Sequence, residues 1–158
     1  DDKFGVFGRR VVFSVTDDDN DYTRHLKRYD IENKLRAYCK KENVSLCLRG
    51  ESYGEGIQRN ENNPHSKKPK GLAVFSVYLI DSNSYAMKGD RHYFVDVCQA
   101  LELPCVDILE ANVLLTLELI KKYSIDLTTV NGVPFEGVVI KTPSCSFKVI
   151  NKTYDSKK

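Results

Sequence analysis

Hydrophobic and polar residues near the end of the chain alternate in a way that predicts two short, paired β-strands. The first covers residues 135–141, where three β-branched residues form an apolar run bracketed by Glu136 and Lys141. The second covers residues 146–152, where period-two alternation places Lys148 on the opposite face from its apolar neighbours. Each strand therefore carries a charge that a hydrophobic core does not need, which makes this hairpin the first candidate site.

Apolar patterns elsewhere predict further strands separated by helices. Strands are expected at residues 4–7, 11–15, 45–48, 71–81 and 104–109. Helices are expected where apolar residues recur every three to four positions, after Asp30, after Asp90 and over residues 112–123. Asp30 and Asp90 are the expected N-caps. Residues 71–81 are apolar on both faces, which indicates a central strand. Polar loops are expected at residues 16–24 and 59–70, and a turn at Asn131-Gly132.

This order of elements predicts an α+β fold built on antiparallel sheets with flanking helices. The length of 158 residues suits one domain, over residues 1–158, with its own hydrophobic core. The hydrophobic share of 41% and the charged share of 29% are ordinary for a globular protein. No apolar run approaches the roughly 20 residues of a membrane span, so no membrane partner is expected.

The cysteines and the net charge narrow the class of protein further. The five cysteines are scattered and none forms a C-x-x-C pair, which argues against a zinc site and against a disulfide framework. Reduced thiols are typical of an intracellular protein, cytoplasmic by default. The net charge of +2 is not that of a strongly basic nucleic-acid-binding protein. The local charge runs are typical of solvated loops.

Two stretches could bind a ligand. Residues 49–58 contain three glycines, which would let the backbone come close to a ligand, but their spacing matches neither the dinucleotide G-x-G-x-x-G pattern nor a phosphate-binding loop. The C-terminal hairpin carries a carboxylate and an ammonium, which suit a polyanionic ligand with a metal ion. The same pattern is equally typical of a structural hairpin, so the residues alone leave both interpretations open.

Five blocks, taken together and in order, resemble the motifs of the covalent nucleotidyltransferases. The blocks are Gly5-Val6-Phe7-Gly8-Arg9-Arg10 (motif Ia), Arg49 to Gln58 (motif III), Leu72 to Val77 (motif IIIa), Phe135 to Lys141 (motif IV) and Ser146 to Lys152 (motif V). The Gly-x-Gly-Ile-Gln ending of motif III is similar to that of ATP-dependent RNA ligases of the T4 ligase 2 and Naegleria- and Deinococcus-like groups. The resemblance implies a nucleotidyltransferase domain with the ATP-grasp-like fold of a ligase adenylation domain.

The resemblance also implies a reaction in three steps. A lysine attacks the α-phosphate of ATP and becomes lysyl-AMP, the AMP moves to an RNA 5′-phosphate, and an RNA 3′-hydroxyl displaces it to seal the strand. The implied ligands are ATP, Mg²⁺ or Mn²⁺, and RNA ends with a 5′-phosphate and a 3′-hydroxyl. We expect the protein to act as a monomer.

Three residues of the first half of the chain would bind the nucleotide if the resemblance holds. Arg9 would contact a phosphate of the nucleotide or of the RNA end, and Glu51 would hold the ribose or a metal-bound water. Phe75 would stack on adenine. Without the resemblance, Arg9 and Glu51 would be solvated turn residues, and Phe75 would be a core residue of its strand.

Three residues near the C-terminus would act on the phosphates. Glu136 would contact the nucleotide and bind metal or orient the lysine, and Lys148 would neutralise the α-phosphate and promote attack. Lys152 would assist Lys148. Without the resemblance, these residues would be ordinary surface charges.

Two features depart from the family pattern. The chain has no Lys-x-Asp-Gly tetrapeptide, the nucleophile motif that lies upstream of motif Ia, and Lys3 lacks the aspartate and lies too near Arg9 to replace it. We expect the nucleophile strand to be missing from the N-terminus, so that this chain alone cannot form lysyl-AMP. Ser76 stands where these ligases often have aspartate.

The remaining sequence leaves three kinds of protein to compare. Only six residues follow Lys152, so no C-terminal RNA-binding domain is expected. The leading hypothesis is the core of an ATP-dependent RNA ligase. The main alternative is a non-catalytic nucleotide- or RNA-binding relative that has lost the lysine. A DNA ligase or guanylyltransferase is a third hypothesis, and motif III disfavours it.

Overall fold

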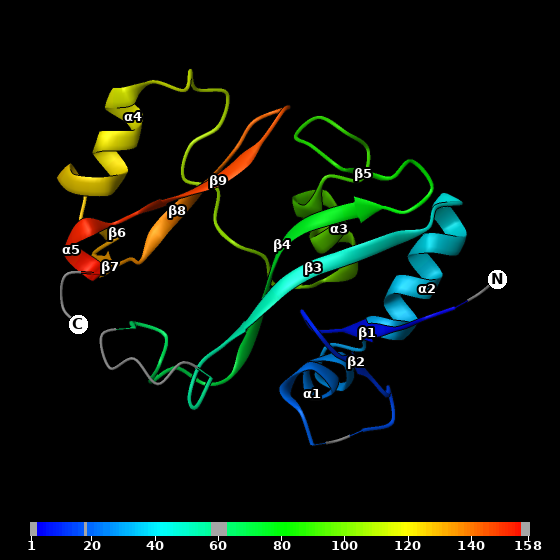
Figure 1. Cartoon of the computed structure of the whole chain (residues 1–158). Helices are drawn as coiled ribbons and strands as arrows, with labels where there is room; N and C mark the ends of the chain where they lie inside the picture. Colours follow the sequence, from blue (N-terminus) through cyan, green and yellow to red (C-terminus); the bar gives the residue numbers. More distant parts are fainter. Residues whose placement is uncertain (1–2, 18, 58–62, 156–158) are drawn as a thin grey trace. The chain divides into compact units, whose positions relative to one another are not determined.

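The computed structural model describes residues 3–17, 19–57 and 63–155, which form two compact units (Figure 1). Unit 1 comprises residues 1–52 and 71–106, and unit 2 comprises residues 53–70 and 107–158. Gln58 of motif III and part of the expected loop at 59–70 lie outside the described residues. Helices and small antiparallel sheets confirm the expected α+β class. Across the described ranges, no helix is long and apolar enough to cross a membrane.

The three-stranded sheet of unit 1 has the order β3–β4–β5. Its strands are β3 (Leu46–Tyr53), β4 (Gly71–Leu79) and β5 (Ser84–Tyr85). The strand β4 lies in the middle, as its apolar faces predict, and pairs antiparallel with β5 so that Tyr78 lies opposite Tyr85. The strand β3 extends beyond the expected end at Leu48. Arg49, Gly50 and Glu51 in the middle of the strand are exposed, so this part of the strand lacks an apolar pattern.

The N-terminal part of unit 1 is a hairpin followed by a helix. The elements are β1 (Val6–Phe7), β2 (Val12–Phe13) and α1 (Asp21–Arg28). The hairpin confirms two predicted strands, which are shorter than expected. The loop predicted over residues 16–24 is wrong from Asp21 onward, because the side chain of Asn20 accepts a hydrogen bond from the backbone N–H of Thr23 at 3.0 Å and caps α1. The polar residues before the helix concealed its start.

Two further helices confirm the predicted apolar stripes, although their aspartates act differently from what was expected. These helices are α2 (Ile31–Glu42) and α3 (Phe94–Leu101). Asp30 lies at the N-cap of α2 but caps no backbone N–H, and its carboxylate accepts a bond from the Asn33 side chain at 2.7 Å. Asp90 lies before the N-cap of α3 and accepts a bond from the backbone N–H of Met87 at 2.7 Å, within the preceding turn. Neither aspartate is therefore the predicted capping residue.

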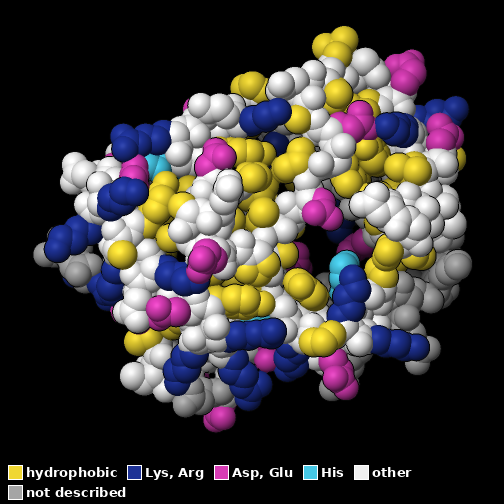
Figure 2. Space-filling view, turned by 180° about the vertical axis from the view of Figure 1, so that it is seen from behind, with side chains coloured by type: hydrophobic (Ala, Val, Ile, Leu, Met, Phe, Trp, Pro, Cys, Tyr) yellow, Lys and Arg dark blue, Asp and Glu magenta, His cyan; other side chains and the backbone are white. Residues whose placement is uncertain are grey.

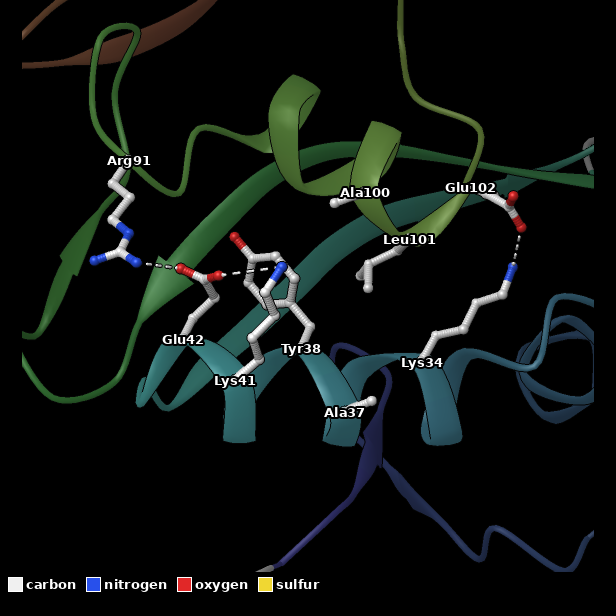
Figure 3. Close-up of a pocket in the computed structure, with 9 residues that line it drawn as sticks. All are labelled: Lys34, Ala37, Tyr38, Lys41, Glu42, Arg91, Ala100, Leu101 and Glu102. Carbon is white, nitrogen blue, oxygen red and sulfur yellow. Dashed lines mark hydrogen bonds and ion pairs between the residues drawn. The ribbon is translucent and has the colours of Figure 1, made fainter.

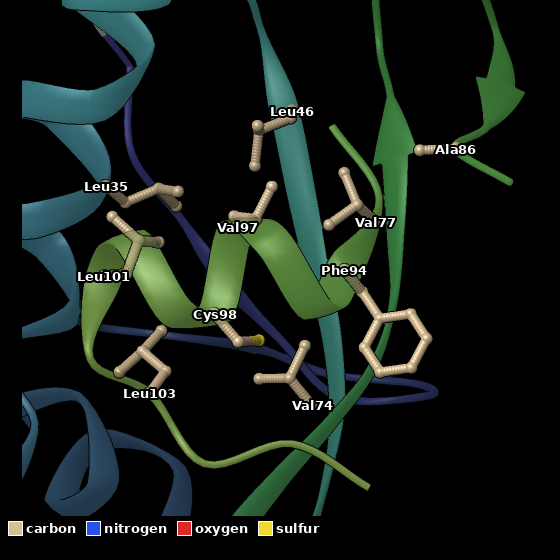
Figure 4. Packing of buried hydrophobic residues seen from close by; sticks show 10 residues of the cluster. All are labelled: Leu35, Leu46, Val74, Val77, Ala86, Phe94, Val97, Cys98, Leu101 and Leu103. Atoms are coloured by element: carbon tan, nitrogen blue, oxygen red, sulfur yellow. The ribbon is translucent and has the colours of Figure 1, made fainter. Parts of the chain in front are cut away.

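The hydrophobic core of unit 1 packs α3 against β4, with additional residues from α2 and β3 (Figure 4). The side chains of Val97 and Cys98 on α3 and of Val74 and Val77 on β4 are at most 1% exposed. Val74 and Val77 both lie in this core although they are three residues apart, so the two-residue alternation of a regular strand fails between them. Removing these apolar side chains from water is the main favourable contribution to folding of the unit.

Unit 2 is built from two hairpins and short helical segments. Its elements are α4 (Leu117–Lys121), the π-helical turn η1 (Lys122–Asp126), β6 (Thr129–Val130), β7 (Val133–Pro134), β8 (Gly137–Lys141), β9 (Ser146–Ile150) and α5 (Lys152–Asp155). Antiparallel pairing of β8 with β9 confirms the predicted C-terminal hairpin. The turn predicted at Asn131-Gly132 joins β6 to β7, with φ angles of 51° and 76°.

Two predicted elements differ from the structure. The expected strand at 104–109 is reduced to a parallel bridge between Cys105 and Val74. The expected helix at 112–123 starts only at α4, because the Thr116 hydroxyl accepts a bond from the backbone N–H of Leu119 at 3.2 Å and caps it. The leucine-rich residues before this cap lie outside the helix.

Tyr123 anchors the π-helical turn of unit 2. Its side chain is 6% exposed, and its hydroxyl donates a hydrogen bond to Oε1 of Glu110 at 2.5 Å. The ammonium of Lys122 contacts the same oxygen at 2.5 Å. Burial and the bond to Glu110 raise the pKa of Tyr123 from 10.0 to about 12. The folded state therefore favours the neutral phenol.

This pKa predicts a loss of stability at alkaline pH. The folded-state pKa lies above the unfolded value, so the contribution of the neutral phenol is complete below about pH 10 and is lost as the pH rises towards 12. We expect Tyr123→Phe to lose less stability than the wild type across this range, as measured by urea unfolding. Tyr22→Phe, at a tyrosine that is 44% exposed, should follow the wild type. Equal loss in wild type and Tyr123→Phe would contradict the assignment.

Candidate functional site

The β8–β9 hairpin brings two of the predicted site residues into contact. Lys148 lies on β9 directly opposite Val139 of β8. Its Nζ donates to Oε1 of Glu136 at 2.6 Å, with the two side chains 41% and 54% exposed. Phe147 and Val149 are more buried, so Lys148 faces solvent as its alternation predicts. An ion pair this exposed contributes only about 0–1 kcal/mol to stability, so a ligand could separate it at little cost.

Backbone geometry fixes the position of Glu136. Gly137 follows it at the start of β8, where an added Cβ would collide with the carbonyl oxygen of Val149. Only glycine therefore permits the two strands to approach this closely beside Glu136. The backbone carbonyl of Glu136 also accepts a hydrogen bond from the backbone N–H of Asn151 at 2.9 Å.

Asn151 is a positioning residue that the sequence reading did not single out. Its side chain is 1% exposed, and its amide nitrogen donates to the carbonyl oxygens of Phe135 at 2.8 Å and Thr128 at 3.3 Å. Its amide oxygen accepts from the backbone N–H of Thr153 at 3.1 Å. Asn151 thus connects the residue before Glu136 to the first turn of α5. A polar residue between a strand and a helix is the signal that could have identified it.

Lys152 lies at the start of α5, and not in a strand as its block predicted. The strand β9 ends at Ile150, because Asn151 turns the chain into the helix. The side chain of Lys152 is exposed.

In the same helix, burial raises the pKa of Tyr154 and the charge of Glu136 adds to this effect.

Glu51 and Phe75 belong to the three-stranded sheet of unit 1. Glu51 is exposed on β3, and period-two alternation places it on the same face as Arg49. Phe75 is half-buried on β4, and the guanidinium carbon of Arg49 lies 5.8 Å from the centroid of its ring. Gly50, between Arg49 and Glu51 on β3, permits close packing against β4, since a Cβ there would lie 3.0 Å from the carbonyl oxygen of Ala73. The half-buried side chain of Phe75 is neither fully in the core nor fully exposed.

Arg9 lies at the tip of the β1–β2 hairpin and is exposed. The backbone N–H of Gly8 donates to the carbonyl of Val11 at 2.8 Å, which closes the turn. Within the described residues, no carboxylate forms a salt bridge with Arg9.

The family model for RNA ligase matches residues 1–153 of the chain. The chain belongs to the RNA ligase family. This confirms the resemblance to RNA ligases. A comparison with curated proteins finds no match.

Solved structures of an RNA ligase from Naegleria gruberi have a similar fold. A variant of that RNA ligase with ATP and Mn matches 100% of this chain at 26% identity and a TM-score of 0.78. A structure with PPi matches 99% of the chain at 27% identity and a TM-score of 0.77. A variant with AMP and Mn matches 100% of the chain at 26% identity and a TM-score of 0.77. The chain spans 46% of the length of each of these proteins. It therefore corresponds to less than half of the Naegleria RNA ligase.

The two predicted metal-binding carboxylates, Glu51 and Glu136, would need further oxygen ligands to bind a metal ion. Over the described ranges, no group of three or more His, Cys, Asp and Glu side chains could hold a metal ion. Carboxylate oxygens are the donors that Mg²⁺ and Mn²⁺ prefer, and Mg²⁺ is commonly bound by one or two carboxylates together with substrate phosphates. Glu51 and Glu136 fit that role as single carboxylates, so phosphate oxygens would have to complete the coordination.

A pocket of about 500 Å³ lies between α2 and α3 and contains none of the predicted site residues (Figure 3). Its charged residues are paired: Arg91 contacts Glu42 at 2.6 Å, and Lys34 contacts Glu102 at 3.3 Å. Salt bridges between neighbouring elements account for these charges without a ligand. The pocket is therefore not the site that the sequence motifs predict.

Basic side chains on the face seen in Figure 2 are interspersed with acidic ones. This distribution agrees with the small net charge of +2. Arg49 on β3 is an exposed cation, and the sequence analysis assigned it no role.

Proposed function

We propose that this chain is the nucleotide-binding part of an ATP-dependent RNA ligase that joins RNA ends carrying a 5′-phosphate and a 3′-hydroxyl. The observation that carries the proposal is the exposed contact of Lys148 with Glu136 at 2.6 Å, on the motif IV–V hairpin of a family member. Opposite charges in solvent contribute little to stability. Chemistry is therefore the better explanation of their placement, because an ammonium suits phosphate and a carboxylate suits a divalent cation.

The proposed reaction begins at the α-phosphate of ATP. A lysine amine attacks the phosphorus, so that a P–N bond forms while the bond to pyrophosphate breaks. Lys148 neutralises the α-phosphate as charge develops there, and Lys152 assists it. AMP then passes to the RNA 5′-phosphate, and the 3′-hydroxyl displaces AMP to form the new phosphodiester. The 158 residues contain no Lys-x-Asp-Gly tetrapeptide, so the attacking lysine belongs to a segment outside them.

The remaining residues hold the nucleotide. Phe75 stacks on adenine, Arg9 contacts a phosphate, and Glu51 contacts the ribose. Glu136 in unit 2 and Glu51 in unit 1 would each offer one carboxylate to Mg²⁺ or Mn²⁺, which supplies further neutralisation of phosphate charge when bound. The Naegleria gruberi RNA ligase solved with ATP and Mn supports these ligands for this chain.

A labelling experiment separates the proposal from its alternatives. The protein that carries the upstream lysine would be incubated with α-labelled ATP and Mg²⁺ and then denatured. A covalent AMP adduct that forms with ATP but not with GTP or NAD supports the ATP-dependent ligase. Tight ATP binding without an adduct would favour the non-catalytic relative, and an adduct from GTP would favour a guanylyltransferase.

Phe75 provides a test of ATP binding that needs no catalysis. Loss of one base–aromatic stack costs about 1–3 kcal/mol, so Phe75→Ala should weaken ATP binding about tenfold in equilibrium titrations of the 158-residue protein. Phe75→Tyr keeps an aromatic ring and should bind ATP within about threefold of the wild type, well inside the cost of a lost stack. Wild-type ATP affinity in Phe75→Ala would remove Phe75 from the site.

A further inference from the structure

Four side chains from the three strands of the unit 1 sheet form a continuous row. The guanidinium carbon of Arg49 on β3 lies 5.8 Å from the ring centroid of Phe75 on β4 and 5.3 Å from that of Tyr85 on β5. An Arg49 N–H also donates to the hydroxyl of Tyr85. The ring of Tyr78 continues the row, since its centroid lies 5.1 Å from that of Tyr85 at an angle of 67°. Both distances from the guanidinium fall within the range of a cation–π contact.

Arg49 and Tyr85 are the exposed members of this row. Tyr85 is 46% exposed and belongs to a strand of two residues. Arg49 is exposed, and no salt bridge within the described ranges joins it to a carboxylate. An exposed aromatic ring beside a guanidinium without a counter-ion is the combination that binds unpaired nucleotides, by stacking and by phosphate contact.

We propose that Arg49 and Tyr85 form a subsite for one unpaired nucleotide of the RNA substrate, with its base stacked on Tyr85 and its phosphate bound by Arg49. The inference rests on the proposed function, because it takes Phe75 as the contact for adenine. Arg49 contacts both Phe75 and Tyr85, so the RNA nucleotide would lie directly beside the ATP base. The planar guanidinium can bind phosphate through two parallel N–H bonds.

Tyr78 is a positioning residue in this subsite. Its hydroxyl donates to the side chain of Asn83 in the turn before β5. Asn83 adopts a left-handed backbone conformation with φ of 53°. The contact ties the turn to the edge-on ring of Tyr78, against which Tyr85 rests. The face of Tyr85 is thereby held for a base without Tyr78 touching the RNA.

The test measures two affinities in the same variants. A fluorescent single-stranded RNA of mixed sequence, with a 5′-phosphate, and ATP would be titrated separately into the 158-residue protein. We expect Tyr85→Ala to weaken RNA binding roughly tenfold while ATP binding changes less than twofold. Arg49→Gln should weaken RNA binding and also reduce the slope of log affinity against log salt by about 0.7, the value for one phosphate contact to a single strand.

Matched variants exclude a general effect on folding or charge. Tyr22→Ala removes a tyrosine of similar exposure, 44%, from α1, and Lys40→Gln removes an exposed charge from α2. Both should keep wild-type RNA affinity and salt slope. Tyr85→Phe keeps the stacking face and should bind RNA nearly as the wild type does.

Each other outcome overturns a defined part of the argument. If Tyr85→Ala weakens ATP binding and leaves RNA binding unchanged, the row binds ATP and the proposed RNA subsite is wrong. If RNA affinity in Tyr85→Ala and Arg49→Gln equals that in the matched controls, the subsite is also wrong, although the proposed function stands. If the wild type binds RNA but not ATP, the proposed function is contradicted, and the subsite loses the ATP site on which it rests.

Discussion

Replacing Lys148 with alanine should reduce formation of the AMP adduct at least a hundredfold. The proposed role of the Lys148 ammonium is to neutralise charge on the α-phosphate, and loss of one such preorganised group costs about 10²–10³ in rate. The variant would be made in a protein that carries the upstream lysine and assayed with α-labelled ATP and Mg²⁺. Because the ion pair of Lys148 with Glu136 is exposed, the fold should be almost unaffected.

Lys121→Ala is the matched control for Lys148. It also removes an exposed lysine from unit 2, at the end of α4, and should form the adduct at the wild-type rate. Lys148→Arg keeps the charge but changes its shape, and we expect intermediate activity. Wild-type adduct formation by Lys148→Ala would refute the catalytic role and return the hairpin to a structural interpretation.

Replacing Asn151 with leucine should destabilise the fold by about 3 kcal/mol or more. The change leaves the carbonyl oxygens of Phe135 and Thr128 and the N–H of Thr153 without their side-chain partner. Each buried polar group without a partner costs about 1–3 kcal/mol. Urea unfolding at neutral pH would measure the difference, and the activity of the folded fraction should also fall because Glu136 loses its support.

Two variants separate hydrogen bonding from packing at Asn151. Asn151→Asp has nearly the same volume but places an oxygen against two carbonyl oxygens, so it should also destabilise the protein strongly. Asn33→Ala removes an exposed asparagine with one side-chain bond of 2.7 Å to Asp30, and its effect should stay within about 0.5 kcal/mol. A stable Asn151→Asp variant would contradict the proposed role of the amide.

Local pattern predicted the elements whose burial follows a simple period. The stripe of α3 and the middle position of β4 were correct because apolar residues there face one core. The start of α1 was missed because the capping residue Asn20 follows a run of acids that also suits a loop. The second half of β3 was missed because an exposed strand carries polar residues. Neither feature has a hydrophobic signal.

The local sequence pattern also predicted some features of the candidate site and missed others. Alternation correctly predicted that Lys148 faces solvent, because its neighbours on β9 are more buried. The placement of Lys152 in a strand was wrong, because the Asn151 side chain accepts a bond from the backbone N–H of Thr153 and turns the chain into α5. The other bonds of Asn151 reach residues more than ten positions away in the chain, which a local pattern does not contain. The contact of Arg49 with Tyr85 was not predicted, because these residues lie far apart in the sequence and on two strands, β3 and β5, that flank β4. The catalytic roles themselves stay predictions.

The glycine at the start of β8 has a consequence for how such chains diverge. A side chain at Gly137 would collide with the neighbouring strand, so the requirement for glycine comes from the fold and persists whether or not chemistry takes place. Glu136 and Lys148 are exposed and can drift once selection on chemistry ends. Descendants that have become inactive should therefore keep this glycine while losing the charged pair beside it.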